Sequence, residues 1–257
     1  MRILGIETAT ASQSVALLDD QQVLAEAAWS GAGSRGGKLL PMIDSVLRKA
    51  GVAPSAIEAI AVSVGPGSFT GVRVGLATAK GMILGTHAAL IGVSTLEALA
   101  AGCALRNAIV CVLLDAGRGE VYAGLYQYTG SELRQLCPEA VLSPEAIALQ
   151  ALALMAGEIH LIGDGVARYR ERLEVAFQGR ARVTDEGWKA VPTAALVARL
   201  AFGQLQKAET GTSRDREVVP VYLRRAEAET NWEKGLVKSP LERLATGKGA
   251  RLGRVPI

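Results

Sequence analysis

The order in which strand-like and helix-like segments follow one another constrains this chain more than any other feature. Apolar runs typical of buried strands follow one another closely at residues 3–6, 14–18 and 23–29. Residues 38–50 then have a helical period, and strand and helix patterns alternate up to residue 101. The same order returns from residue 109, with two strands first and helices afterwards. A pattern of this kind, present twice, predicts two α/β halves of related architecture, each with a mixed sheet.

The chain is large enough for such a fold, because 257 residues with 49% hydrophobic side chains can bury a sizeable core. No uncharged apolar stretch reaches about 18 residues, so we expect no membrane span. Glu7 comes too early for the apolar core of a signal peptide. The cysteines Cys103, Cys111 and Cys137 have no CxxC spacing, which is typical of a reducing compartment. We therefore expect a cytoplasmic protein.

The formal net charge of +3 is unevenly distributed. Residues 231–257 hold six basic and two acidic side chains, a balance of +4, which leaves −1 for residues 1–230. A basic segment can contact phosphates, or it can be a solvated extension. We expect residues 226–257 to form a basic, flexible tail.

The segment Gly65-Pro66-Gly67-Ser68-Phe69-Thr70-Gly71-Val72-Arg73 stands between a predicted strand and a predicted helix. Such a glycine-rich turn can bind an anion at the helix N-terminus, or it can be a structural turn with an N-cap. It matches neither the Walker nor the dinucleotide pattern. A literal GxGxxG at residues 31–36 follows the wrong strand for a dinucleotide site, and we expect a loop there.

Two carboxylates end the first strand of each half and look symmetry-related, Glu7 and Asp115. They are candidates for contact with Mg²⁺ or phosphate through water, or for hydrogen bonds to turns. The possible nucleotide or phosphate contacts are therefore Glu7, Thr8, Ser68, Arg73 and Asp115.

Metal and hydrolase chemistry find little support. His87 and His160 are far apart and form no HxxxH or HExxH pair, so we expect structural roles and no metal ligands. No G-x-S-x-G motif occurs, which disfavours a hydrolase.

The helix after Gly71 carries small residues one turn apart, including Gly71, Gly75 and Ala79. Small side chains allow another element to approach closely. Two interpretations stay open, namely packing on the sheet and a subunit interface shared with residues 38–50.

Several motifs, in order over residues 1–225, resemble the bacterial TsaB family, also called YeaZ. They are Ile3-Leu4-Gly5-Ile6-Glu7-Thr8-Ala9-Thr10, Leu39-Leu40-Pro41-Met42-Ile43, the glycine-rich segment, Gly92-Val93-Ser94-Thr95-Leu96, Asp115-Ala116-Gly117-Arg118-Gly119-Glu120-Val121-Tyr122 and Pro220-Val221-Tyr222-Leu223-Arg224. The resemblance implies a two-lobed, actin-like α/β fold of the sugar-kinase and heat-shock-chaperone type, with mixed five-stranded sheets flanked by helices. We expect a first lobe at 1–103, completed by 192–225, and a smaller lobe at 104–191.

The resemblance also implies a function: a non-catalytic partner of TsaD, the subunit that forms N6-threonylcarbamoyladenosine in tRNAs reading codons that start with A. It implies direct binding to TsaD, contact with TsaE through the TsaB–TsaD complex, a homodimer and only indirect contact with tRNA. ATP and metal are expected on the partners, with no cofactor held tightly by this chain. The interface residues implied are Leu39, Leu40, Ile43, Val46, Thr70, Gly71, Val74, Gly75, Thr78 and Met82.

The chain departs from its relatives at Ser34–Lys38, where two glycines disfavour an early helix start. Two other functions stay open. A free-standing ATP-binding small-molecule kinase would use the glycine-rich turn, Glu7 and Asp115. A peptidase would need a metal or nucleophile constellation that the sequence does not show.

Overall fold

The structure is a computed structural model of the chain. It describes residues 1–31, 36–86, 88–103, 105, 108–129, 132–154, 158–183, 191–209 and 217–224. The fold below is that of the unit Met1–Leu223. The predicted tail at 226–257, the loop residues 32–35 and His87 lie outside the described residues.

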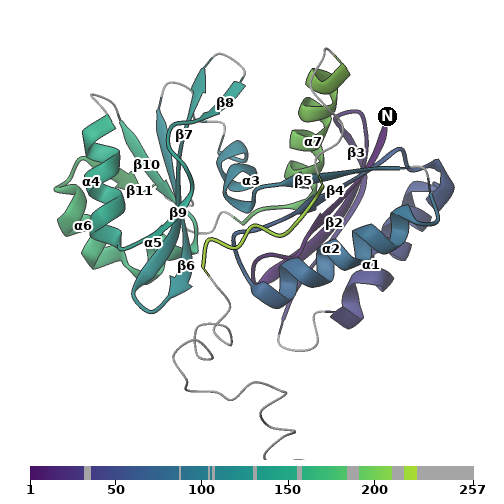
Figure 1. Ribbon diagram of the computed structural model, residues 1–257, viewed down its shortest axis with the longest axis horizontal. Helices are drawn as coiled ribbons and strands as arrows, with labels where there is room; N and C mark the ends of the chain where they lie inside the picture. The colour runs from purple at the N-terminus through teal and green to yellow at the C-terminus, as the bar shows by residue number, and fades with distance from the viewer. Residues whose placement is uncertain are drawn as a thin grey trace, which may run out of the picture. The chain divides into compact units, whose positions relative to one another are not determined.

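The first sheet has five strands in the order β3-β2-β1-β4-β5 (Figure 1). Its strands are β1 (Arg2–Glu7), β2 (Ser12–Asp19), β3 (Gln22–Ser30), β4 (Ala59–Ser63) and β5 (Ala89–Val93). The first three are antiparallel, with Ile6 opposite Val15, whereas β4 and β5 are parallel to β1. Apolar side chains on both faces of β1, β2 and β4 explain why these strands read as continuous hydrophobic runs.

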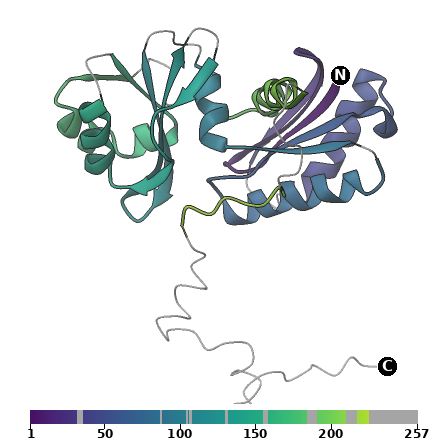
Figure 2. The same ribbon diagram turned by 45° about the horizontal axis from the view of Figure 1, so that its top comes forward.

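Helices cover both faces of the first sheet (Figure 2). On one face α1 (Gly36–Ala50) and α2 (Phe69–Ile83) enclose a core that includes Leu4, Leu39 and Leu76. On the other face α7 (Ala194–Glu209) packs on Ile3 and Ala61. The sheet is therefore the middle layer of three.

The second sheet repeats this strand order, as β8-β7-β6-β10-β11. It contains β6 (Ile109–Gly117), β7 (Glu120–Thr129), β8 (Glu132–Gln135), β9 (Ala140–Leu142), β10 (Ile159–Ile162) and β11 (Ala181–Val183). The last helices are α3 (Thr95–Ala101), α4 (Pro144–Leu154), α5 (Asp164–Arg168) and α6 (Arg170–Phe177). One face packs on α4 to α6 and the other on α3.

The duplicated strand order confirms the two-lobed, actin-like α/β fold. Two details were wrong. The second sheet has six strands instead of five, because β9 also pairs with β7. Helix α1 begins at Gly36, the first of the two glycines, and not after them. The tertiary packing of buried residues such as Leu39 and Ile43 outweighs the low helix propensity of the glycines. The lobe boundaries stay a prediction.

Side-chain hydrogen bonds join the first-lobe helix α3 and its N-cap to the second sheet. Glu139 accepts hydrogen bonds from the hydroxyls of Ser94, the N-cap of α3, and Tyr126 on β7. Tyr128 donates to the carbonyl of Ala101 at 3.1 Å.

Of the helices in the described part of the chain, none has both the length and the apolar character that a bilayer span requires.

Candidate functional site

The glycine-rich turn connects β4 to α2 and is held in place by backbone hydrogen bonds. The amide of Ser68 donates to the carbonyl of Ala9 at 2.7 Å, and the amide of Thr95 donates to Gly65 at 2.9 Å. Gly65 has a φ of +104°, in the region that glycine adopts without strain. Ser68 is the N-cap of α2, because its hydroxyl accepts a hydrogen bond from the Gly71 amide at 3.3 Å. The turn thus fixes where α2 begins.

Gly71 and Gly75 let α2 lie directly against the turn that follows β1. The Thr8 hydroxyl donates to the Gly71 carbonyl at 2.8 Å. A Cβ at Gly71 would collide with the Thr8 carbonyl, and one at Gly75 with the Thr8 hydroxyl. Both glycines are therefore needed for packing inside the lobe, which is the first of the two interpretations that the sequence left open.

Glu7 is fully buried at the end of β1. Its Oε1 accepts a hydrogen bond from the Ala9 amide at 2.6 Å, whereas Oε2 has no partner of good geometry among the described residues. Burial raises the pKa of Glu7 to about 7, and the Ser63 hydroxyl and the Ala9 amide only limit this rise. A carboxyl group in this position is not accessible to a phosphate or a hydrated metal ion.

Asp115 uses both of its carboxylate oxygens within the chain. Oδ1 accepts hydrogen bonds from the Gly117 amide at 2.9 Å and the Tyr169 hydroxyl at 2.8 Å. Oδ2 pairs with Arg168 Nε at 3.2 Å. The five predicted phosphate contacts therefore form no shared site: Glu7 and Thr8 are buried, Ser68 caps α2, and Asp115 belongs to the second sheet.

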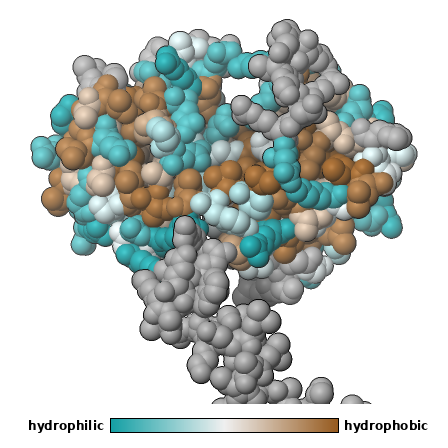
Figure 3. Space-filling model, in the orientation of Figure 1, coloured by the Kyte–Doolittle hydropathy of each residue, from teal (hydrophilic) through white to brown (hydrophobic). Residues whose placement is uncertain are grey.

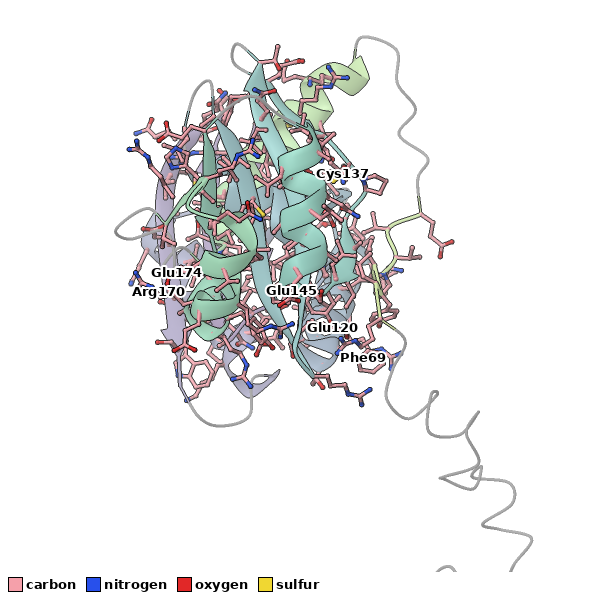
Figure 4. All side chains as sticks on the ribbon, turned by 90° about the vertical axis from the view of Figure 1, so that its left-hand side faces the viewer. Phe69, Glu120, Cys137, Glu145, Arg170 and Glu174 are labelled. Atoms are coloured by element: carbon pink, nitrogen blue, oxygen red, sulfur yellow. The ribbon has the colours of Figure 1, made fainter. Side chains whose placement is uncertain are left out.

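Arg73, the fifth candidate, lies in an aromatic cluster at the first turns of α2. Its guanidinium carbon is 3.8 Å from the ring centroid of Phe69, which Figure 4 labels beside the segment 217–224. Its Nε donates to the Tyr222 hydroxyl at 2.8 Å, and the rings of Phe69 and Tyr222 are 5.0 Å apart. Sequence reasoning gave Phe69 and Tyr222 no role, because 153 positions separate them along the chain.

The segment 217–224 lies along the glycine-rich turn. The Val221 amide donates to the Val64 carbonyl at 2.7 Å, and a Cβ at Gly65 would meet the Val221 carbonyl. Val221 and Leu223 also line an open groove together with Ser94, Gln135, Leu136, Cys137, Pro138 and Glu139. This segment therefore packs against the glycine-rich turn near the start of α2.

Ten residues were predicted to form a partner interface on α1 and α2, and burial divides them. Half of them are interior and cannot reach a partner directly, since they pack on the sheet or on Thr8; these are Leu39, Ile43, Val46, Gly71 and Gly75. Val74, Thr78 and Met82 are half-buried. Leu40, which is 60% exposed, and Thr70 lie on the surface. The buried residues support the helices, and the exposed ones are available for binding.

The exposed side of α2 contains residues that the sequence analysis did not select. Ala77, Gly81 and the C-cap residue Leu84 are all exposed and follow the predicted residue Thr70 at helical intervals, and Leu84 is 89% exposed. A Cβ at Gly81 would meet nothing within 4 Å. The helical spacing of these residues can be read from the sequence, but only the burial of Gly71 and Gly75 shows which side of α2 faces outward.

In the part of the chain that the structure describes, no group of three or more His, Cys, Asp or Glu side chains could hold a metal ion. His160 lies on β10, where its Nε2 is 3.5 Å from Glu158 and its Nδ1 is buried. Among the charged residues that Figure 4 labels, Arg170 pairs with Glu174 at 2.9 Å. Glu145 forms two hydrogen bonds with Arg172, which lower the pKa of this carboxyl to about 2.

Comparison with known proteins gives consistent matches. The family model described as TsaD, tRNA N6-adenosine threonylcarbamoyltransferase, matches residues 36–232. The tRNA threonylcarbamoyladenosine biosynthesis protein TsaB of Escherichia coli strain K12 is 40% identical over 173 residues, which are 64% of this chain and 72% of that protein. TsaB of Bacillus subtilis strain 168 is 30% identical over 232 residues, 90% of this chain and 98% of its own length.

A solved structure supports the same assignment. YeaZ from Pseudomonas aeruginosa superimposes with a TM-score of 0.70 at 30% identity, covering 86% of this chain and 99% of that chain. The chain therefore belongs to the TsaB (YeaZ) family of tRNA threonylcarbamoyladenosine biosynthesis proteins and is a paralogue of the TsaD family.

Proposed function

We propose that this chain is a non-catalytic subunit that binds and activates TsaD in the formation of N6-threonylcarbamoyladenosine in tRNA. The outer surface of α1 and α2 binds TsaD, with Leu40, Thr70, Ala77, Gly81 and Leu84 at its centre. Similarity to TsaB proteins supports a role in the biosynthesis of threonylcarbamoyladenosine in tRNA. The exposed residues of α2 support a role through binding of a partner.

Gly81 carries this proposal. A glycine inside a helix costs about 0.5–1 kcal/mol relative to alanine, so it needs a compensating reason. Gly71 and Gly75 have that reason inside the lobe, but Gly81 does not, because a Cβ there would point into open space. With Ala77 one turn earlier, it forms a shallow place on α2 that allows a second helix to approach closely. Leu84, three residues after Gly81, and Leu40 on α1 are exposed apolar side chains.

The arrangement around the glycine-rich turn supports a role without catalysis. The buried Glu7 and the fully hydrogen-bonded Asp115 are the groups that the kinase alternative needs. Both serve the fold, so we favour the partner role over a free-standing kinase. We further propose that ATP and metal are held by the partners, that TsaE binds through the TsaB–TsaD complex, and that contact with tRNA is indirect. A weak homodimer uses the same surface.

Reconstitution tests the proposal. TsaD, TsaE and the threonylcarbamoyl-adenylate-forming enzyme are incubated with tRNA, with or without this chain, and the modified nucleoside is quantified. We expect no product from the chain without TsaD and much less product from TsaD without the chain. Gly81→Leu removes the stimulation, whereas Ala153→Leu, at an exposed position of α4, retains it. Full modification by TsaD in the absence of this chain would refute the proposal.

A further inference from the structure

The helices of the proposed interface are much more basic than the rest of the folded chain. Together α1 and α2 carry five basic side chains and one acidic one, a balance of +4; these are Lys38, Arg48, Lys49, Arg73, Lys80 and Asp44. Since residues 1–230 total −1, everything else in that range carries −5. The net charge of residues 1–230 is therefore unevenly distributed, with an excess of positive charge on this pair of helices and an excess of negative charge elsewhere.

Arg73 differs from the other cations of these helices in being both ordered and unpaired. Phe69 and Tyr222 fix its guanidinium group, and only Nε is used, by the Tyr222 hydroxyl. No acidic side chain pairs with Arg73 among the described residues, whereas Arg48 is bound to Asp44 at 3.0 Å. An arginine whose orientation is already fixed loses little conformational entropy on binding, and its free Nη groups suit a carboxylate.

We infer that the α1/α2 surface selects an acidic protein partner, with the Arg73 fork donating to a carboxylate on that partner. The inference rests on the proposed function, because it describes the chemistry of the TsaD surface that this one fits. It also predicts which of two partners binds this surface more tightly. In a homodimer the +4 of one α1/α2 surface faces the +4 of the other, whereas an acidic partner brings opposite charge.

RNA is a less suitable occupant of this surface. The cations are five over two helices, of which α2 alone is about 22 Å long, and exposed apolar residues such as Leu40 and Leu84 lie among them. A phosphate backbone neutralises dense positive charge but leaves leucines in water, whereas a helical protein surface covers them. Figure 3 shows hydrophobic and hydrophilic surface side by side in this region.

Binding constants at two salt concentrations test the inference. The affinity for purified TsaD and the homodimer constant are measured at about 0.05 M and about 0.5 M NaCl, because salt screens exposed charges. The variants are Arg73→Glu and the control Arg134→Glu, which changes an exposed arginine on β8. Binding of unmodified tRNA is measured in parallel.

We expect TsaD affinity to fall at least about tenfold in high salt and at least about tenfold in Arg73→Glu, with Arg134→Glu unchanged. The homodimer should be no weaker in high salt and no weaker in Arg73→Glu. If TsaD affinity changes neither with salt nor in Arg73→Glu, this inference is overturned but the proposed function is not. Loss of tRNA binding with TsaD binding intact in Arg73→Glu also overturns it, in favour of RNA. No TsaD binding in any condition overturns both.

Discussion

Arg73 Nε donates a hydrogen bond to the hydroxyl of Tyr222 at 2.8 Å, across 149 positions of sequence. This contact ties the segment 217–224 to the first turns of α2, the helix that carries the proposed interface. Stability and partner binding should therefore respond together to changes in this cluster.

Tyr222→Phe keeps the ring on Phe69 and removes only the hydroxyl acceptor. We expect a loss of about 0.5–1.5 kcal/mol in the free energy of unfolding, the net value of one hydrogen bond, measured by urea denaturation. Tyr222→Leu also removes the ring contact and should cost more. A phenylalanine variant that is less stable than the leucine variant would contradict the role given to the ring.

Two glycines of one helix should respond oppositely to the same substitution. Gly81→Ala should stabilise the free chain by about 0.5–1 kcal/mol, because alanine favours the helix and a Cβ there meets nothing. Gly71→Ala should destabilise it by about 1–3 kcal/mol, because the Cβ collides with the Thr8 carbonyl. Thermal unfolding of both variants checks this, and a destabilised Gly81→Ala would show that Gly81 has an internal role.

Glu7 should make stability depend on pH in an unusual direction. Burial raises its folded-state pKa to about 7, above the unfolded value near 4.5, so the folded state binds more protons between these values. The contribution is fully present below about pH 4.5 and is lost as pH rises through 7, by on the order of 3 kcal/mol. Glu7→Gln should remove this loss. Parallel pH profiles of unfolding free energy for the two proteins would contradict the burial argument.

Much of the first lobe could be predicted from the sequence because the periodicity of its hydrophobic residues is strong. The strands predicted at 3–6, 14–18 and 23–29 lie within β1, β2 and β3. In the second lobe β8, β9, α5, α6 and β11 were missed, since strands of three or four residues and helices of five and eight residues contain too few periods to detect.

The candidate site was less predictable, because its decisive facts are contacts between distant segments. The sequence shows small residues on several sides of α2, but the position of Thr8 decides that Gly71 and Gly75 face inward. Likewise Asp115 has the expected place at a strand end, yet Tyr169 and Arg168 use its oxygens. Neither relationship follows from spacing along the chain.

The most direct test of the central claim is sedimentation of this chain with purified TsaD at low salt. We predict a heterocomplex for the unmodified chain and for Ala153→Leu, and free subunits for Ala77→Leu, whose added side chain stands on the exposed side of α2. Circular dichroism of each variant confirms that it is folded. Co-sedimentation of Ala77→Leu with undiminished affinity, or failure of the unmodified chain to bind TsaD, would contradict the account.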